Sequence, residues 1–157
     1  MKNYSRLVLV LFLFAALSCK KKQDEPVYGD NMECNSVLPS KISFTLSNRS
    51  WCADASCFAD LAIGLTANGI NSNASSITLE LDSLRPGTYV INNETNHILY
   101  TNGNAYESTN ANPGTLVITS NDETRNVLKG TFSVTLVSPI LGSISINNGT
   151  FDLLYTE

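Results

Sequence analysis

The sequence predicts an all-β protein, and three observations support this. From Lys41 onward apolar side chains recur at every second residue, as in Ile42, Phe44 and Leu46, which is the period of a half-buried strand. Turn residues interrupt the pattern about every eight to twelve residues. Helical periodicity is weak throughout, and residues 53–61 are the one helix candidate. We therefore predict an antiparallel β-sandwich of about eight to ten short strands, with a lipocalin-like up-and-down barrel as the alternative.

The strands are expected in a regular order between polar turns. They are predicted at 42–46, from 51, at 61–65, 77–81, 89–91, 97–101, around 106, and at 116–118, 127–137, 144–146 and 151–155. The turns are marked by Asn48-Arg49-Ser50, a polar loop from Asn68-Gly69 to Ser76, Pro86-Gly87, Asn102-Gly103 and Asn147-Asn148-Gly149. Gly130 and Gly149 are expected where the chain needs positive φ or a close backbone approach, with Phe132 and Phe151 pointing inward.

The N-terminus has the order of a bacterial lipoprotein signal. Lys2 and Arg6 precede an apolar stretch at 7–17, which is too short to span a bilayer as a stable helix. Ser18 then stands directly before Cys19, and three lysines follow. We expect cleavage before Cys19 and lipid on its thiol, which makes the membrane a partner. The predicted organisation is a signal peptide at 1–18, a lipidated tether and N-terminal arm at 19–40, and a single β-sandwich domain at 41–157.

Charge and a short acidic motif indicate where the protein acts. Lys22-Gln23-Asp24-Glu25 resembles the tag that sends Bacteroidota lipoproteins to the outer face of the outer membrane, although a solubilising charge run is the simpler alternative. We predict a lipid-anchored outer-membrane protein that faces the cell surface, with the periplasmic face as the alternative. From Pro26 onward the chain has 5 basic and 12 acidic residues, which excludes nucleic acid as a partner.

Three thiols remain once Cys19 carries lipid. An exported location permits disulfides, so Cys34, Cys52 and Cys57 allow one bond and one free thiol. We favour Cys52–Cys57 because the two are nearest in sequence, although so short a loop contributes only about 2 kcal/mol. A bond from Cys34 to either would contribute about 3 kcal/mol and attach the N-terminal arm to the domain. A zinc site is not expected, because the one histidine, His97, is far from the cysteines.

Enzymatic chemistry is not predicted. His97 is the single imidazole, and one histidine is more often a structural residue than a general base. The carboxylates are scattered, and no Gly-x-Ser-x-Gly elbow, phosphate loop, His-Glu-x-x-His or calcium-loop spacing occurs. We therefore expect neither a cofactor nor a metal ion.

Two further patterns suggest modification and binding. Asp82-Ser83-Leu84 resembles the Bacteroidota periplasmic O-glycosylation site, which would place the sugar on Ser83. Seven asparagines surround Tyr100 and Tyr106: Asn92, Asn93, Asn96, Asn102, Asn104, Asn110 and Asn112. Amides and aromatic rings are the groups that recognise sugars, so the two tyrosines are a candidate ligand platform. The alternative is that asparagine builds turns here. Trp51 is expected in the core.

Four motifs in order carry a family resemblance: Leu84-Arg85-Pro86-Gly87-Thr88-Tyr89, Gly114-Thr115-Leu116-Val117-Ile118-Thr119, Leu128-Lys129-Gly130-Thr131-Phe132-Ser133-Val134 and Asn148-Gly149-Thr150-Phe151-Asp152-Leu153. With the Ser18-Cys19 signal, they resemble an uncharacterised family of short Bacteroidota lipoproteins, most clearly over residues 77–155. The resemblance implies an all-β envelope lipoprotein and supplies no catalytic residues.

The leading functional hypothesis is a non-enzymatic binding or structural accessory of the outer membrane, for glycans or for an envelope protein. One alternative is a periplasmic carrier barrel for a small ligand, which would leave a cavity where a sandwich packs Phe44, Leu79, Phe132 and Phe151. A second alternative is an inhibitor of secreted hydrolases.

Overall fold

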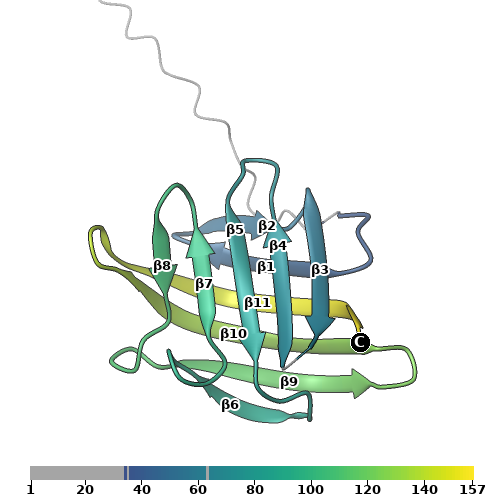
Figure 1. Cartoon of the computed structure of the whole chain (residues 1–157). Coiled ribbons are helices and arrows are strands. Elements are labelled where there is room, and N and C mark those ends of the chain that lie inside the picture. Colours follow the sequence, from purple (N-terminus) through teal and green to yellow (C-terminus); the bar gives the residue numbers. More distant parts are fainter. Residues whose placement is uncertain (1–33, 35, 63) are drawn as a thin grey trace, which may run out of the picture.

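The computed structural model describes residues 34, 36–62 and 64–157, and within these ranges the chain forms eleven strands and no helix (Figure 1). The strands are β1 (Lys41–Leu46), β2 (Arg49–Cys52), β3 (Ser56–Leu61), β4 (Leu65–Ile70), β5 (Ser76–Leu81), β6 (Gly87–Ile91), β7 (Ile98–Thr101), β8 (Ala105–Glu107), β9 (Gly114–Asp122), β10 (Val127–Ser138) and β11 (Gly142–Thr156). The all-β prediction is confirmed, with one strand more than the upper end of the expected range. The helix candidate at 53–61 contains β3.

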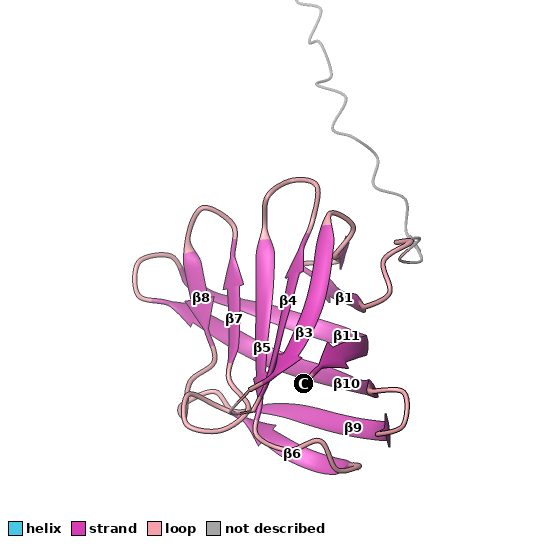
Figure 2. Ribbon diagram, turned by 45° about the vertical axis from the view of Figure 1, so that its right-hand side comes forward, coloured by secondary structure: helices cyan, strands magenta, loops and turns pink. Residues whose placement is uncertain are grey.

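The strands lie in two layers that are joined at two corners (Figures 1 and 2). We call β3, β4, β5, β7 and β8 the front sheet, and β2, β1, β11, β10, β9 and β6 the back sheet. At one corner β11 pairs in parallel with β3, where Tyr155 is opposite Ala59. At the other corner β10 meets β8 through Val137 and Glu107. The result is a sandwich with a barrel-like outline, not a clear closed barrel.

Aromatic rings from both layers fill the space between the sheets. The ring of Phe44 stacks on Trp51 with centroids 4.6 Å apart, and it meets Phe132 edge-on at 6.2 Å. Phe151 lies 6.5 Å from Phe132, and Leu79 belongs to the same buried cluster. The expectation that Trp51 belongs to the core is confirmed, because it is 6% exposed. The four side chains named in the sequence analysis therefore pack into one core.

Two reciprocal glycine–phenylalanine pairs join β10 to β11. Gly130 is opposite Phe151, and Phe132 is opposite Gly149. A Cβ atom on Gly149 would lie 2.6 Å from the carbonyl oxygen of Phe132 and 2.7 Å from its ring. At Gly130 a Cβ atom would overlap the Phe151 ring and the carbonyl oxygen of Val117. Both glycines sit beside register shifts, so the expectation of a bulge with close backbone approach is confirmed.

The predicted turn at Asn147-Asn148-Gly149 lies within a strand. Asn147 and Asn148 belong to β11, where they form a bulge opposite the single residue Ser133. Asn148 has φ of 51°, a left-handed conformation that asparagine tolerates, so the turn-forming residue serves a bulge instead. The long pairing between β10 and β11 on both sides of this bulge keeps the strand continuous.

The predicted polar loop from Asn68-Gly69 to Ser76 is present but starts later, because Asn68 and Gly69 lie inside β4 and the loop to β5 covers 71–75. β3 ends at Leu61 and the antiparallel strand β4 begins at Leu65, so the predicted single strand at 61–65 is wrong. Gly69 is required here because a Cβ atom would lie 2.9 Å from the Cβ of Ala53. Glycine in this strand therefore reflects a close approach of another segment, not a reversal of the chain.

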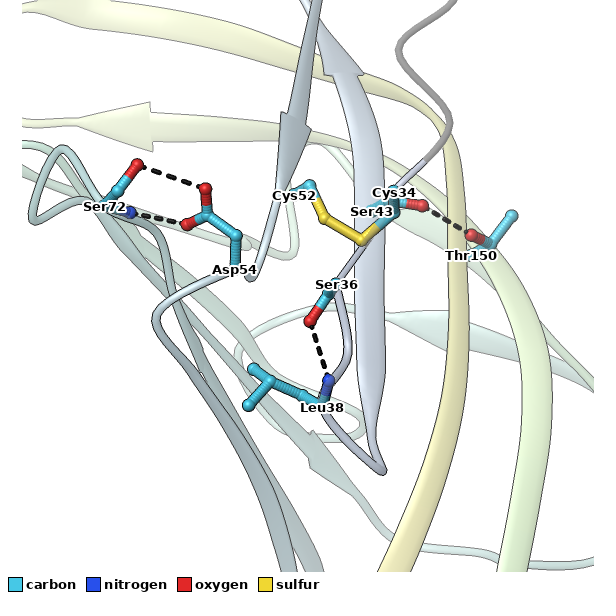
Figure 3. Close-up of a disulfide and its surroundings, with 8 residues drawn as sticks. All are labelled: Cys34, Ser36, Leu38, Ser43, Cys52, Asp54, Ser72 and Thr150. Carbon is cyan, nitrogen blue, oxygen red and sulfur yellow. Dashed lines mark hydrogen bonds between the residues drawn. A yellow bond between two sulfur atoms is a disulfide. The ribbon is translucent and has the colours of Figure 1, made fainter.

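The disulfide joins Cys34 to Cys52 with their Cα atoms 5.6 Å apart, and Cys57 is free and buried (Figure 3). The favoured Cys52–Cys57 pairing is therefore wrong, and the alternative that involves Cys34 holds. The reason is strand alternation, since Trp51 and Cys57 face the core while Cys52 faces away from it. The bond attaches the N-terminal arm to the edge strand β2.

A second contact holds the end of the arm. The Ser40 hydroxyl accepts a hydrogen bond from the backbone N–H of Leu154 at 3.0 Å and lies 3.2 Å from its carbonyl oxygen. Ser40 is almost fully buried, so residues just before β1 pack on the domain. The predicted signal peptide at 1–18, the predicted lipid site Cys19 and the acidic motif at 22–25 lie outside the described residues. Within the described residues no helix is long and apolar enough to cross a membrane.

Candidate binding face

The structure corrects the predicted tyrosine platform. Tyr100 and Tyr106 are opposite each other in the β7–β8 hairpin, and their ring centroids are 6.4 Å apart. Both rings are on the inner side of the front sheet, where Tyr100 is 4% exposed and packs edge-on against Phe44 and Trp51. A ring this deeply buried cannot present its face to a sugar. The cause is the period of two, which turns Tyr100 inward together with Ile98.

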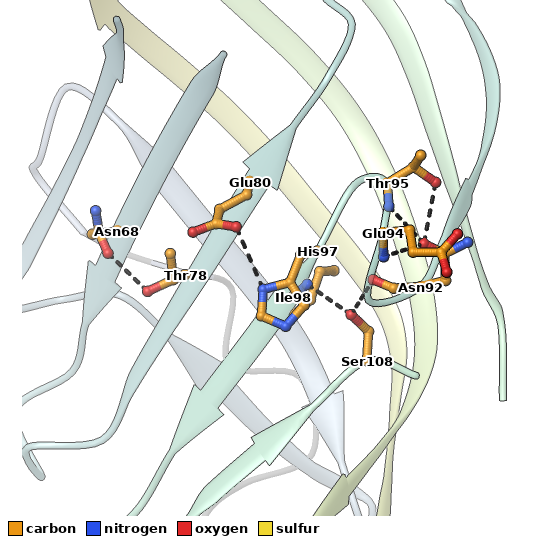
Figure 4. Close-up of polar contacts among 9 residues, drawn as sticks. All are labelled: Asn68, Thr78, Glu80, Asn92, Glu94, Thr95, His97, Ile98 and Ser108. Atoms are coloured by element: carbon orange, nitrogen blue, oxygen red, sulfur yellow. Dashed lines mark hydrogen bonds and ion pairs between the residues drawn. The ribbon is translucent and has the colours of Figure 1, made fainter. Parts of the chain in front are cut away.

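The asparagines beside these tyrosines build turns, as the alternative interpretation proposed. The Asn92 side-chain oxygen accepts hydrogen bonds from the backbone N–H groups of Glu94 at 2.8 Å and Thr95 at 2.6 Å (Figure 4). Asn96 has φ of 49° and donates its amide to the carbonyl oxygen of Val90 at 3.0 Å. These amides are used by the backbone, so this loop presents few free groups for a ligand.

The outer side of the front sheet presents a row of mixed side chains that crosses five strands. Strand register places Phe58 opposite Asn68, Asn68 opposite Thr78, Thr78 opposite Leu99 and Leu99 opposite Glu107. Residues that are directly opposite in an antiparallel pair point to the same face. No described element lies in front of this sheet in Figure 1. We call this surface, made of Phe58, Asp60, Thr66, Asn68, Thr78, Glu80, His97, Leu99 and Glu107, the binding face.

Phe58 is the one aromatic side chain of the binding face. It is 54% exposed, because strand β3 turns its neighbours Cys57 and Ala59 inward and leaves Phe58 outward. A benzene ring at this exposure has no role in the core. An exposed ring on a flat sheet offers an apolar surface against which a ligand can stack.

Polar groups beside Phe58 have fixed orientations. Asn68 accepts a hydrogen bond on its side-chain oxygen from the Thr78 hydroxyl at 2.8 Å (Figure 4). This contact turns the amide nitrogen, which has two N–H donors, away from Thr78. In the next row, the Nδ1 atom of His97 lies 3.5 Å from a Glu80 carboxylate oxygen, and their side chains are 25% and 57% exposed. The binding face therefore combines a ring with amide, hydroxyl and carboxylate groups.

The charges of the binding face have one sign. Its strands carry the carboxylates of Asp60, Glu80 and Glu107, and no lysine or arginine. The lysines and arginines of the described chain lie in the back sheet or in loops, at Lys41, Arg49, Arg85, Arg125 and Lys129. The two sheets thus present different electrostatic surfaces to solvent.

A shallow depression of about 190 Å³ opens on the back sheet beside the β11 bulge. Its walls include Thr115, Ser133, Thr135, Ser145 and Asn147, and the Thr135 and Ser145 hydroxyls are hydrogen-bonded at 3.2 Å. The depression has hydroxyl groups but no aromatic ring. It is therefore a weaker match to sugar recognition than the binding face.

The remaining predicted site residues are separate from the binding face. Ser83 is half-buried, and its hydroxyl forms hydrogen bonds with the Tyr89 hydroxyl at 3.0 Å and the Arg85 backbone N–H at 3.2 Å. Modification of Ser83 stays a prediction, and it would require this hydroxyl to give up both contacts.

The free thiol is a core residue. Burial raises the pKa of Cys57 to about 11, so this thiol stays protonated at neutral pH. Across the described ranges, no group of three or more His, Cys, Asp or Glu side chains is arranged to hold a metal ion.

A family model described as "Domain of unknown function (DUF6252)" matches residues 43–153. The chain belongs to this family. The family domain covers the sandwich from β1 to β11, which includes Phe58 and the whole binding face. It reaches further toward the N-terminus than the resemblance over 77–155 implied. No significant match is found among curated proteins or among solved structures.

Phe58 is the residue that sequence reasoning missed. The segment around it is the helix candidate at 53–61, and this interpretation assigns no strand face to its side chains. The signal was present, since small or apolar Cys57 and Ala59 alternate with Phe58 and Asp60 at the period of a strand. Which side of that alternation faces the core depends on the opposing sheet, and only the fold decides it.

Proposed function

We propose that this protein is a lipid-anchored envelope protein of the outer membrane that binds glycans, without catalysis, through the outer side of its front sheet. The observation that supports the proposal most is the exposed ring of Phe58 in register with the oriented amide of Asn68. Aromatic rings stack on the apolar faces of sugars, and amides exchange hydrogen bonds with sugar hydroxyls.

The family membership and the core are compatible with this proposal. A packed interior that contains Phe44, Phe132 and Phe151 offers no support for the alternative of a small-ligand carrier. A family model of unknown function leaves the ligand open. Binding at an outer sheet face requires only surface side chains, so the sandwich can serve as a rigid support for it.

The proposed location rests on the N-terminal sequence. The apolar stretch that ends at Ser18-Cys19 and the acidic motif at 22–25 favour lipidation and export to the cell surface. Protease treatment of intact cells tests this part of the proposal. Loss of the protein from intact cells supports surface exposure, whereas digestion only after lysis would place it on the periplasmic face.

The binding proposal is tested with the intact purified protein on an array of bacterial, plant and host glycans. We expect Phe58→Ala to weaken binding about tenfold, which corresponds to about 1.4 kcal/mol and is within the range for one aromatic contact. Leu154→Ala is the matched control, because Leu154 is 44% exposed on the back sheet.

Three results can be distinguished. Loss in the Phe58 variant with retention in the control supports glycan binding by this face. Equal loss in both variants, or unchanged binding in both, contradicts the assignment of the site. Absence of glycan binding together with Phe58-dependent capture of one defined envelope protein would assign the face to a protein partner instead.

A further inference from the structure

We propose that the binding face selects uncharged, extended glycans and excludes anionic ones, an inference that rests on the glycan-binding function proposed above. The selectivity follows from the distribution of charge on the binding face and from the length of the side-chain row across the strands.

The negative charge of the binding face is the reason that anionic glycans are excluded. Asp60, Glu80 and Glu107 all point outward from the front sheet, and no cation of these strands compensates them. Two unit charges about 7 Å apart in water repel enough to weaken an association by about threefold. Because each carboxylate contributes to the same surface, a uronic acid or phosphate group bound there should be disfavoured by about tenfold in total, and less at high salt.

His97 does not change the negative sign of the charge on the binding face. Its ring contacts the Glu80 carboxylate at 3.5 Å, so it is occupied by one of the acidic groups of the face. The lysines and arginines of the described residues are in loops or in the back sheet, such as Arg85 after β5 and Lys129 in β10. Lys129 is itself paired with Asp152 at 2.7 Å.

The spacing of the strands sets the length of the glycan that the row of side chains can contact. The row from Phe58 to Glu107 crosses four strand spacings, which corresponds to about 19 Å at the usual distance between strands. A ligand that uses both the ring and the polar groups beyond Asn68 must extend across the strands. A single sugar ring can stack on Phe58 but cannot reach the far end of the row.

The test is titration of the intact protein with neutral hexasaccharides (cellohexaose, maltohexaose, xylohexaose and mannohexaose), with cellobiose, maltose, xylobiose and mannobiose, and with anionic hexagalacturonate. We expect at least one neutral hexasaccharide to bind ten times more tightly than hexagalacturonate and than its own disaccharide. Higher ionic strength should strengthen only hexagalacturonate binding. In the double variant Glu80→Gln/Glu107→Gln, the affinity for hexagalacturonate relative to that for the neutral hexasaccharide should rise about fivefold, and an unchanged ratio would contradict the role of these carboxylates in excluding anions.

The outcomes separate the two proposals. If neutral and anionic hexasaccharides bind equally and both depend on Phe58, the selectivity is wrong and the glycan-binding function stands. If the disaccharide binds as tightly as the hexasaccharide, the extended geometry is wrong. If no probe binds, or if binding is indifferent to Phe58→Ala, the glycan-binding function itself fails.

Discussion

The Gly149→Ala substitution tests whether the close approach of β10 and β11 controls the stability of this fold. A methyl group at this position would lie 2.6 Å from the Phe132 carbonyl oxygen and 2.7 Å from two atoms of its ring. Ordinary contacts of this kind begin at about 3.4 Å, so the neighbouring strand must move by several tenths of an ångström. The ring can rotate, but the carbonyl oxygen belongs to the backbone of β10 and is held by the strand pairing.

Overpacking of this kind costs about 3 kcal/mol when backbone must move. Replacing glycine by alanine within a strand raises the free energy of unfolding by about 0.5–1 kcal/mol, because alanine loses less conformational entropy on folding. The expected net loss is therefore about 2 kcal/mol in the free energy of unfolding. For a domain of this size that corresponds to a decrease in Tm of about 8 °C.

Urea denaturation and thermal unfolding measure the effect, with Ser143→Ala as the control. Ser143 is exposed on the same strand, so its substitution should stay within about 0.5 kcal/mol of wild type. Adding Phe132→Leu to Gly149→Ala removes the ring contact but leaves the carbonyl contact, so a double-mutant cycle should show partial coupling. A Gly149→Ala protein as stable as wild type would refute the reasoning.

Two further predictions concern the cysteines. Cys34→Ser should lower the unfolding free energy by about 3 kcal/mol in denaturation experiments, because it opens a link across 18 residues, and added reductant should have the same effect on wild type. Peptide mapping that joins Cys52 to Cys57 would contradict this pairing. Burial raises the Cys57 pKa to about 11 from 9.0, so the unfolded state loses its thiol proton first as pH rises. Stability relative to Cys57→Ala should therefore be constant below pH 9 and fall by an amount on the order of 2 kcal/mol up to pH 11, and a flat difference across this window would be inconsistent with a buried thiol.

The strands of this protein could be predicted because their signal is local. Ile42, Phe44 and Leu46 alternate with polar residues in the sequence and alternate between core and surface in β1. The inward direction of Phe132 and Phe151, predicted from the motifs that contain Gly130 and Gly149, is also confirmed, because both rings are buried. Short-range alternation is sufficient for this because a strand turns successive side chains to opposite faces.

The candidate site was predicted less well, because its position depends on the pairing between strands. Tyr100 has the composition of a ligand platform, yet it is buried against Phe44 and Trp51. Phe58 is surrounded by residues with no sugar-binding character in the sequence, yet strand register brings Asn68 and Thr78 beside it. The direction in which an aromatic side chain points is set by the opposing layer, and residue type alone does not contain that information.

The sequence by itself determined the all-β class, the approximate strand segments and the asparagine-based loops, since each depends on neighbours only a few residues away. The tertiary structure decided that Asn148 forms a bulge, that Cys34 is the partner of Cys52, and that Phe58 faces solvent. These features arise where segments far apart in the chain meet, as where β1 pairs with β11. Their energies come from contacts across strands and sheets, which no short stretch of sequence specifies alone.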